Sequence, residues 1–240
     1  MAAACPCRPR LKPFHSRGCL HMSEAQTTLL PIGKRIDTII KLALTAPLKA
    51  AGFKKQGRVF RRSRDDGAVE VIDIQGGKYN TGGKGEFTVN LGLYLPQIAA
   101  MLDTPPLEKP QEYQCHFRQR IGALLPQKDE DFWWPMDTAS SDEALAHALQ
   151  QAVLEHALPW FAAFVPEAFQ AAGGDFAQLP GGAPMPLDPL HAASFYLLLG
   201  EHDKARERLN IGLEYRKSLA AQIHALAAAH GLTLKQESQP

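Results

Sequence analysis

The residue types best suited to chemistry occupy alternate positions in three stretches of the chain. Successive side chains of a strand point to opposite faces of a sheet, so alternate positions share one face. That face is expected to hold an acid, a histidine, two arginines, two amides and a phenol. The candidate ligand-binding residues are Asp73, Gln75, Asn90, Tyr94, His116, Arg118 and Arg120. Two arginines can hold an anionic ligand, because a guanidinium binds carboxylate or phosphate in a bidentate manner.

The same face offers one acid and histidine pair for catalysis, Asp73 with His116. A hydrolase or transferase acting on an anionic small molecule would use this pair, with Arg118 and Arg120 anchoring the substrate. Whether the two groups meet depends on strand order, which spacing alone does not define. The alternative is structural, since one face of an antiparallel sheet is normally polar and solvated. No residue is assigned a catalytic role.

A run of basic residues between positions 54 and 64 points to a different function, the binding of nucleic acid. Its arginines are Arg58, Arg61, Arg62 and Arg64. Clustered cations with interleaved phenylalanines are typical of nucleic-acid binding. Acidic residues follow at once, however, and charged edge strands also prevent aggregation of sheets. Weak nucleic-acid binding therefore stays an alternative, and nucleic acid is not the partner we expect.

Composition and the absence of known motifs argue against several other classes of protein. The chain has 240 residues, 45% of them hydrophobic, and a formal net charge of +1. Its apolar runs are far shorter than a membrane span requires, so no membrane partner is expected. No P-loop, H-E-x-x-H or other cofactor motif occurs, and we expect neither a metal nor a cofactor.

The first 21 residues differ from the remainder. They contain four basic residues, no acid and three of the four cysteines, which leaves Cys115 alone in the body of the chain. We interpret residues 1–21 as a disordered leader. A single body cysteine favours a reducing compartment, and we expect the protein to be cytoplasmic.

Hydrophobic periodicity predicts an α+β fold. A helix is expected over 35–51, ended by Gly52, and strands over 58–64, 68–76, 86–95 and 114–122 in a four-stranded antiparallel meander. A helix from Ser141 to about Ala157 begins the C-terminal helical region. The predicted domains are 22–172, an α+β domain, then a Gly/Pro-rich linker over 173–187, then a helical hairpin over 188–240. The second helix of that hairpin is expected to run from Asp203 to about His230.

Several segments resemble a bacterial family of domains of unknown function. They are LKAAGFKKQGRVFRR, the strand with Gln75, FTVNLGLYLP, RIG at 120–122 and the DFWW stretch, in order over roughly 36–160. The resemblance implies the fold and an intracellular bacterial setting. It implies no activity and no catalytic residues, so no site residue comes from it.

The function expected from these observations is a non-enzymatic intracellular binding or accessory protein. Its contact surface is either the polar sheet face or the C-terminal helices, and its partner is a small anionic ligand or a protein. The enzyme and nucleic-acid readings remain the alternatives.

Overall fold

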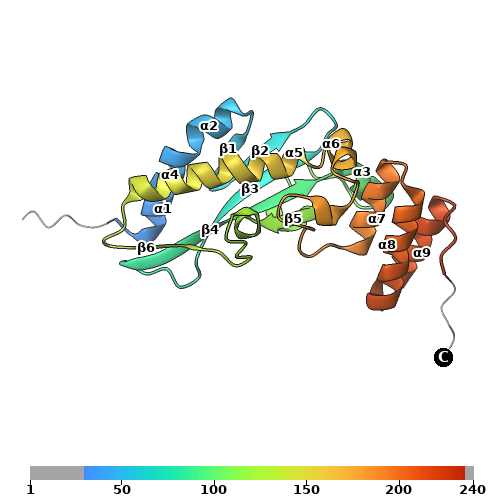
Figure 1. Ribbon diagram of the computed structural model, residues 1–240. Coiled ribbons are helices and arrows are strands. Elements are labelled where there is room, and N and C mark those ends of the chain that lie inside the picture. Colours follow the sequence, from blue (N-terminus) through green and yellow to red (C-terminus); the bar gives the residue numbers. More distant parts are fainter. Residues whose placement is uncertain (1–29, 236–240) are drawn as a thin grey trace, which may run out of the picture.

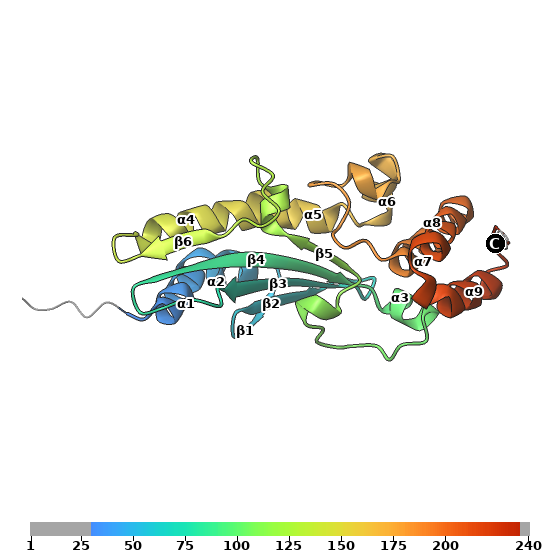
Figure 2. The same ribbon diagram turned by 90° about the horizontal axis from the view of Figure 1, so that it is seen from below.

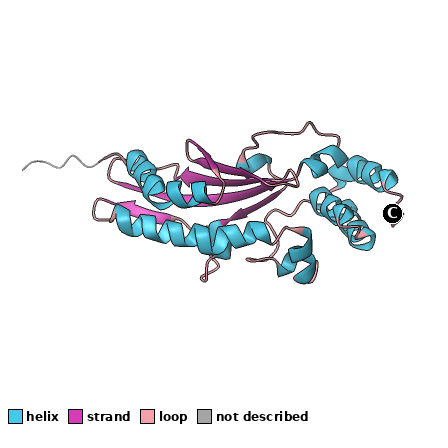
Figure 3. Ribbon diagram, turned by 90° about the horizontal axis from the view of Figure 1, so that it is seen from above, coloured by secondary structure: helices cyan, strands magenta, loops and turns pink. Residues whose placement is uncertain are grey.

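A six-stranded antiparallel sheet with helices packed on one face forms the centre of the computed structural model (Figure 1). The structure describes residues 30–235, so the leader predicted over 1–21 lies outside the described residues. The fold is α+β, as predicted. Seen from below, α4 and α5 run along one side of the sheet (Figure 2), and helices and strands form separate layers in Figure 3.

The sheet has the order β1-β2-β3-β4-β5, and β6 pairs with the beginning of β4. Its strands are β1 (Lys54–Gln56), β2 (Val59–Ser63), β3 (Val69–Gly76), β4 (Lys84–Tyr94), β5 (Phe117–Arg120) and β6 (Trp134–Asp137). The predicted four-stranded meander is thus confirmed as β2 to β5. The fourth strand is shorter than the predicted 114–122, because Glu112–Gln114 and Ile121–Leu124 form 3-10 turns on either side of it. The strands β1 and β6 were not predicted, because a pattern over three or four residues is too short to establish a period of two, whereas the alternation around β5 extends over 114–122.

The helix expected over 35–51 is two helices, α1 (Ile32–Ala43) and α2 (Thr45–Ala50). Pro47 explains the break, because it has no N–H to donate to the carbonyl of Ala43. That carbonyl instead accepts a 3.1 Å hydrogen bond from the Nε2 of Gln150. The predicted end at Gly52 is confirmed, since Gly52 has φ +88°, a conformation that side chains with a Cβ rarely adopt.

The apolar face of β4 lies against the helices. Phe87, Val89, Leu91 and Leu93 are all fully buried in the core that α1 and α4 (Asp142–Ala152) also enter. At the start of β4, Trp134 stacks on Phe87 with ring centroids 5.3 Å apart. The alternation read from the sequence therefore separates the two faces of the sheet.

The region after α4 is helical and belongs to the same core. Its helices are α5 (Leu158–Ala162), α6 (Pro166–Ala171), α7 (Pro189–Leu198), α8 (His202–Tyr215) and α9 (Ala220–Ala229), and α3 (Pro96–Met101) contacts α7. Figure 1 shows α7 to α9 together at the end of the sheet away from α1. Within residues 30–235, no helix is both long enough and apolar enough to cross a membrane.

Two features of this region differ from the sequence-based prediction. The segment 173–187, expected to be a linker, buries Phe176 and Leu179 in the common core. Its glycines and prolines provide turns, which composition alone does not distinguish from a flexible connection. The helix expected from Asp203 to His230 is divided at Arg216, where the backbone leaves the helical region without a glycine or proline.

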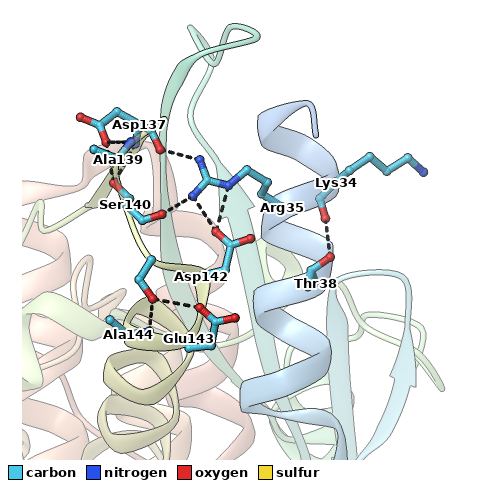
Figure 4. Close-up of polar contacts among 10 residues, drawn as sticks. Lys34, Arg35, Thr38, Asp137, Ala139, Ser140, Asp142, Glu143 and Ala144 are labelled. Atoms are coloured by element: carbon cyan, nitrogen blue, oxygen red, sulfur yellow. Dashed lines mark hydrogen bonds and ion pairs between the residues drawn. The ribbon is translucent and has the colours of Figure 1, made fainter. Parts of the chain in front are cut away.

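A buried arginine joins the first helix to the loop before α4. Arg35, only 6% exposed, donates to Asp142 Oδ1 and to the carbonyls of Asp137 and Ser140 (Figure 4). These bonds are 2.5–2.9 Å long. A buried guanidinium needs this full set of acceptors, because an unpaired buried charge is strongly destabilising.

We predict that Arg35→Ala lowers the free energy of unfolding by about 3–5 kcal/mol, the usual cost of breaking a buried ion pair. The matched control is Arg58→Ala, which removes a more exposed pair with Asp37. The control is expected to cost about 1 kcal/mol or less. Urea unfolding of the two variants measures both values, and equal costs would contradict the assigned role of Arg35.

Candidate functional site

The register of the strands places most of the predicted ligand-binding residues side by side. Asn90 on β4 lies opposite Asp73 on β3 and opposite Arg120 on β5. Two residues further along β4, Gly92 lies opposite Arg118. Gln75 is the next residue of this face on β3, and its Oε1 accepts from Asn90 Nδ2 at 2.8 Å. We call this surface the polar sheet face.

The loop between α3 and β5, residues 102–116, crosses this face (Figure 2). Its backbone N–H at Leu107 donates to Tyr94 Oη, and its carbonyl at Pro110 accepts from Arg61 Nε. Cys115 lies so close to Gly92 that a Cβ there would be 2.6 Å from Sγ. Glycine at position 92 is therefore what allows the loop to lie on the sheet.

The loop carries a buried carboxylate that faces Arg118. Glu112, 8% exposed, accepts from Arg118 Nε at 2.8 Å and from Nη2 at 2.9 Å. This pairing raises the pKa of Arg118, chiefly through the hydrogen bond to Glu112. The bidentate contact fixes the plane of the guanidinium. No bond from Nη1 of Arg118 is found to any described residue.

Arg120 is oriented by different partners. Its Nε donates to Asn90 Oδ1 at 3.3 Å, its Nη1 pairs with the exposed Asp131, and its guanidinium lies 5.2 Å from the ring of Trp133. Within residues 30–235 its Nη2 has no hydrogen-bond partner. Both arginines thus have a defined orientation and one terminal amino group free for a ligand.

A pocket of about 300 Å³ opens beside these two arginines. We call it the β5 pocket, and it is lined by Asn90, Glu112, Arg118, Gln119, Arg120, Glu130, Met185 and Pro186. Met185 belongs to the segment after α6, and its N–H donates to the carbonyl of Arg118 at 3.2 Å. Two arginines and two glutamates make the formal charge of the lining neutral.

Tyr94 and His116 lie away from the pocket, buried at the other end of the face. Their rings stack with centroids 4.7 Å apart, and His116 Nδ1 accepts from the N–H of Leu95. The ring of His191, on α7, meets His116 edge-on at 4.8 Å. Burial, and next the charge of His191, lower the pKa of His116 to about 3.

The acid and histidine pair considered for catalysis is not in contact. Asp73 lies opposite Asn90 on β4, whereas His116 stacks on Tyr94. Asn90 and Tyr94 are four residues apart along β4, which at the spacing of a strand is roughly 13 Å. Asp73 has a raised pKa because of burial and then the nearby Glu112. Burial also raises the pKa of the Cys115 thiol, which makes it a poor nucleophile.

Ion pairs neutralise three of the four arginines of the basic run proposed for nucleic acid. Arg58 pairs with Asp37, Arg62 with Glu70, and Arg64 with Asp66. Arg61 differs, because its partners, Pro110 O and Gln56 Oε1, are neutral. Burial, opposed by Arg62, raises the pKa of Glu70.

The part of the chain described here contains no group of three or more His, Cys, Asp or Glu side chains arranged to hold a metal ion. The cysteine and histidine residues of positions 1–21 lie outside it.

Comparison with known proteins identifies the domain. A family model described as Domain of unknown function (DUF4304) matches residues 44–163. The chain belongs to the DUF4304 family. The match covers the sheet, α4 and α5, and therefore includes the arginines of the β5 pocket but not its wall at Met185 and Pro186. Neither the search of curated proteins nor that of solved structures gave a match.

Several residues of this DUF4304 site were not predicted from the sequence. Glu112 lies in a Pro-rich connection and Glu130 and Asp131 in an acidic turn, neither of which has a period that assigns it to a face. The family segments quoted above include DFWW, whose first residue is Asp131, and this is the signal that could have directed attention to the turn. Met185 is distant in sequence from β5, and nothing local indicates the contact.

We predict that Gly92→Ala destabilises the protein by about 1–3 kcal/mol, the usual cost of overpacking. The added methyl group overlaps Cys115 and lies 3.2 Å from the carbonyl of Glu112. Gly83→Ala is the control, because its Cβ would meet only Thr138 Cγ2 at 3.7 Å. Thermal unfolding compares them, and similar melting temperatures would mean that the loop does not lie on Gly92.

We predict that acid destabilises the protein through His116. The unfolded histidine has an ordinary pKa near 6.5 and the folded one about 3, so the stabilisation is complete above pH 6.5 and declines as the pH falls towards 3. Between pH 7 and pH 5 the loss is about 2 kcal/mol from this group. His191, whose pKa burial lowers against the opposing charge of Asp188, acts in the same direction.

Denaturant unfolding at a series of pH values measures this loss. His116→Gln should reduce the slope of the free energy of unfolding against pH. His147→Gln, which removes an exposed histidine of α4, is the control and should keep the slope of the parent. An unchanged slope in His116→Gln would show that His116 does not cause the acid sensitivity.

Proposed function

We propose that this DUF4304 protein is a non-enzymatic binding protein that holds a small organic carboxylate in the β5 pocket. The observation that supports it best is the pair of fixed guanidinium groups, Arg118 and Arg120, on adjacent rows of one sheet face. Each retains a terminal amino group without a partner among the described residues. A carboxylate has two oxygens and accepts from both groups at once.

The lining also favours one kind of carboxylate. Glu130 and Glu112 balance the charge of the two arginines, so the pocket does not attract anions over a long range. Recognition then rests on directed hydrogen bonds. A ligand with a carboxylate at one end and a donor, such as an ammonium or hydroxyl group, facing Glu130 matches both kinds of lining group. Met185 and Pro186 provide an apolar wall for its carbon skeleton.

Binding is favoured over catalysis by the state of the reactive groups. Cys115 and His116 are buried, and their pKa values are shifted in the direction that keeps both neutral. Neither residue lines the β5 pocket. A hydrolase or transferase needs a nucleophile or base within hydrogen-bond reach of its substrate.

The setting we propose is the bacterial cytoplasm. The supporting observations are the buried thiol of Cys115, which has no disulfide partner within residues 30–235, and the resemblance described above. A cysteine without a partner is typical of proteins kept in a reducing environment.

We predict that a matching amino acid or hydroxy acid raises the melting temperature of the parent, and that Arg120→Gln removes most of this shift. At one hundred times its dissociation constant a ligand adds about 2.7 kcal/mol to stability. A thermal-shift panel of amino acids, hydroxy acids and dicarboxylates makes the measurement. The control, Arg206→Gln, removes an exposed arginine paired with Asp203, just as Arg120 pairs with Asp131.

The proposal fails if no carboxylate at millimolar concentration stabilises the parent, or if Arg120→Gln and Arg206→Gln respond alike. Either result would direct attention to protein partners of the C-terminal helices.

A further inference from the structure

A second hollow of about 560 Å³ lies on the polar sheet face beside β1 and β2. We call it the basic pocket, and it is lined by Gly52, Lys54, Lys55, Gln56, Arg61, Ser63, Val69, Glu108 and Lys109. It shares no residue with the β5 pocket. The loop 102–116 contributes to both, with Glu108 and Lys109 here and Glu112 there.

The basic pocket concentrates positive charge that the protein itself does not neutralise. Its lining has four cations and one acid, Glu108. Within residues 30–235, none of these four cations forms an ion pair with a carboxylate. The nearby arginines 58, 62 and 64 are all paired, as described above. The lining of this hollow therefore has an excess of three positive charges, which the interaction of Arg61 with Asp73 offsets only in part.

Two of the cations are direct cross-strand neighbours. Lys54 on β1 lies opposite Arg61 on β2, so the bases of their side chains are about 5 Å apart on the same face. Like charges in this arrangement repel and destabilise the hairpin. Arg61 is nevertheless held in place by the carbonyl of Pro110 at 2.7 Å, and its Nη1 lies 3.3 Å from Gln56 Oε1. An anion between the two side chains would turn this repulsion into attraction.

We propose that the basic pocket binds the phosphate group of a small phosphorylated molecule. Lysine acts on phosphate as a point charge, and the arginine provides directed donors, so Lys54, Lys109 and Arg61 together match a group that carries two negative charges. The hydroxyl of Ser63 and the amide of Gln56 add hydrogen-bonding groups, and Val69 provides an apolar surface for the remainder of the ligand.

The same chemistry occurs in nucleic-acid backbones, but the geometry favours a small molecule. A nucleic acid contacts a stripe of free cations, because each neutralised phosphate adds to its affinity. Here four cations that form no ion pair within residues 30–235 surround one hollow, and Arg58, Arg62 and Arg64 beside it are neutralised.

Titration calorimetry with inorganic pyrophosphate tests the proposal on the full chain at low salt. The parent is expected to bind, and Lys54→Gln and Lys109→Gln are each expected to weaken binding by about tenfold, the loss of one charge-assisted bond. Lys41→Gln, an exposed lysine of α1, is the control and should bind like the parent. Arg120→Gln should also bind like the parent, which separates this site from the proposed carboxylate site.

Two further measurements make the outcome decisive. Both exposed lysine variants are expected to fold, and Lys54→Gln without ligand should melt slightly above the parent at low salt because it relieves the repulsion of Arg61. No binding of pyrophosphate, or equal binding by the double variant Lys54→Gln/Lys109→Gln, would overturn the proposal. A single-stranded oligonucleotide that binds more tightly than pyrophosphate would replace it with a nucleic-acid site.

Discussion

Strand β4 is the constraint on which the rest of the structure depends. One set of its alternate residues is fully buried against α1 and α4, and the other set forms the centre of the polar sheet face. It pairs with β3 along one edge and with β5 and β6 along the other. A shift of register by one residue would exchange the two faces and expose the core. The apolar contacts of Phe87, Val89, Leu91 and Leu93 therefore also determine where Asn90 and its neighbouring arginines lie.

The cations of the polar sheet face lie in two different electrostatic environments. At β5, Arg118 pairs with Glu112 and Arg120 with Asp131, which fixes the orientation of both guanidinium groups, and the lining of the pocket is formally neutral. At β1 and β2, Lys54 and Arg61 face each other without an acid between them. The loop 102–116 separates these environments and depends on Gly92, since a side chain there would displace it. One loop thus produces a neutral, directional pocket and a positively charged one on the same surface.

The helical C-terminal region is part of the same body as the sheet. Phe176 and Leu179 connect the cores of the two regions, and the Nδ1 of His191 on α7 donates to the backbone oxygen of His116 at 3.1 Å. Because both imidazoles are buried, this junction is more stable when both are neutral. The family match ends at residue 163, so the wall of the β5 pocket at Met185 comes from outside the matched domain.

The sequence by itself determined the α+β class, the strands β2 to β5 and which residues share each sheet face, because these depend on local periodicity and turn residues. It also put Asn90, Arg118 and Arg120 on one face of the sheet, since alternate residues of a strand share a face, whereas their pairing across β4 and β5 came from the register in the structure. Only the tertiary structure decided that Tyr94 and His116 are buried, that Glu112 and Asp131 face the arginines, and that Met185 closes the pocket. These contacts join residues far apart in sequence, and no local pattern records which loops cross a sheet or which carboxylate reaches which arginine.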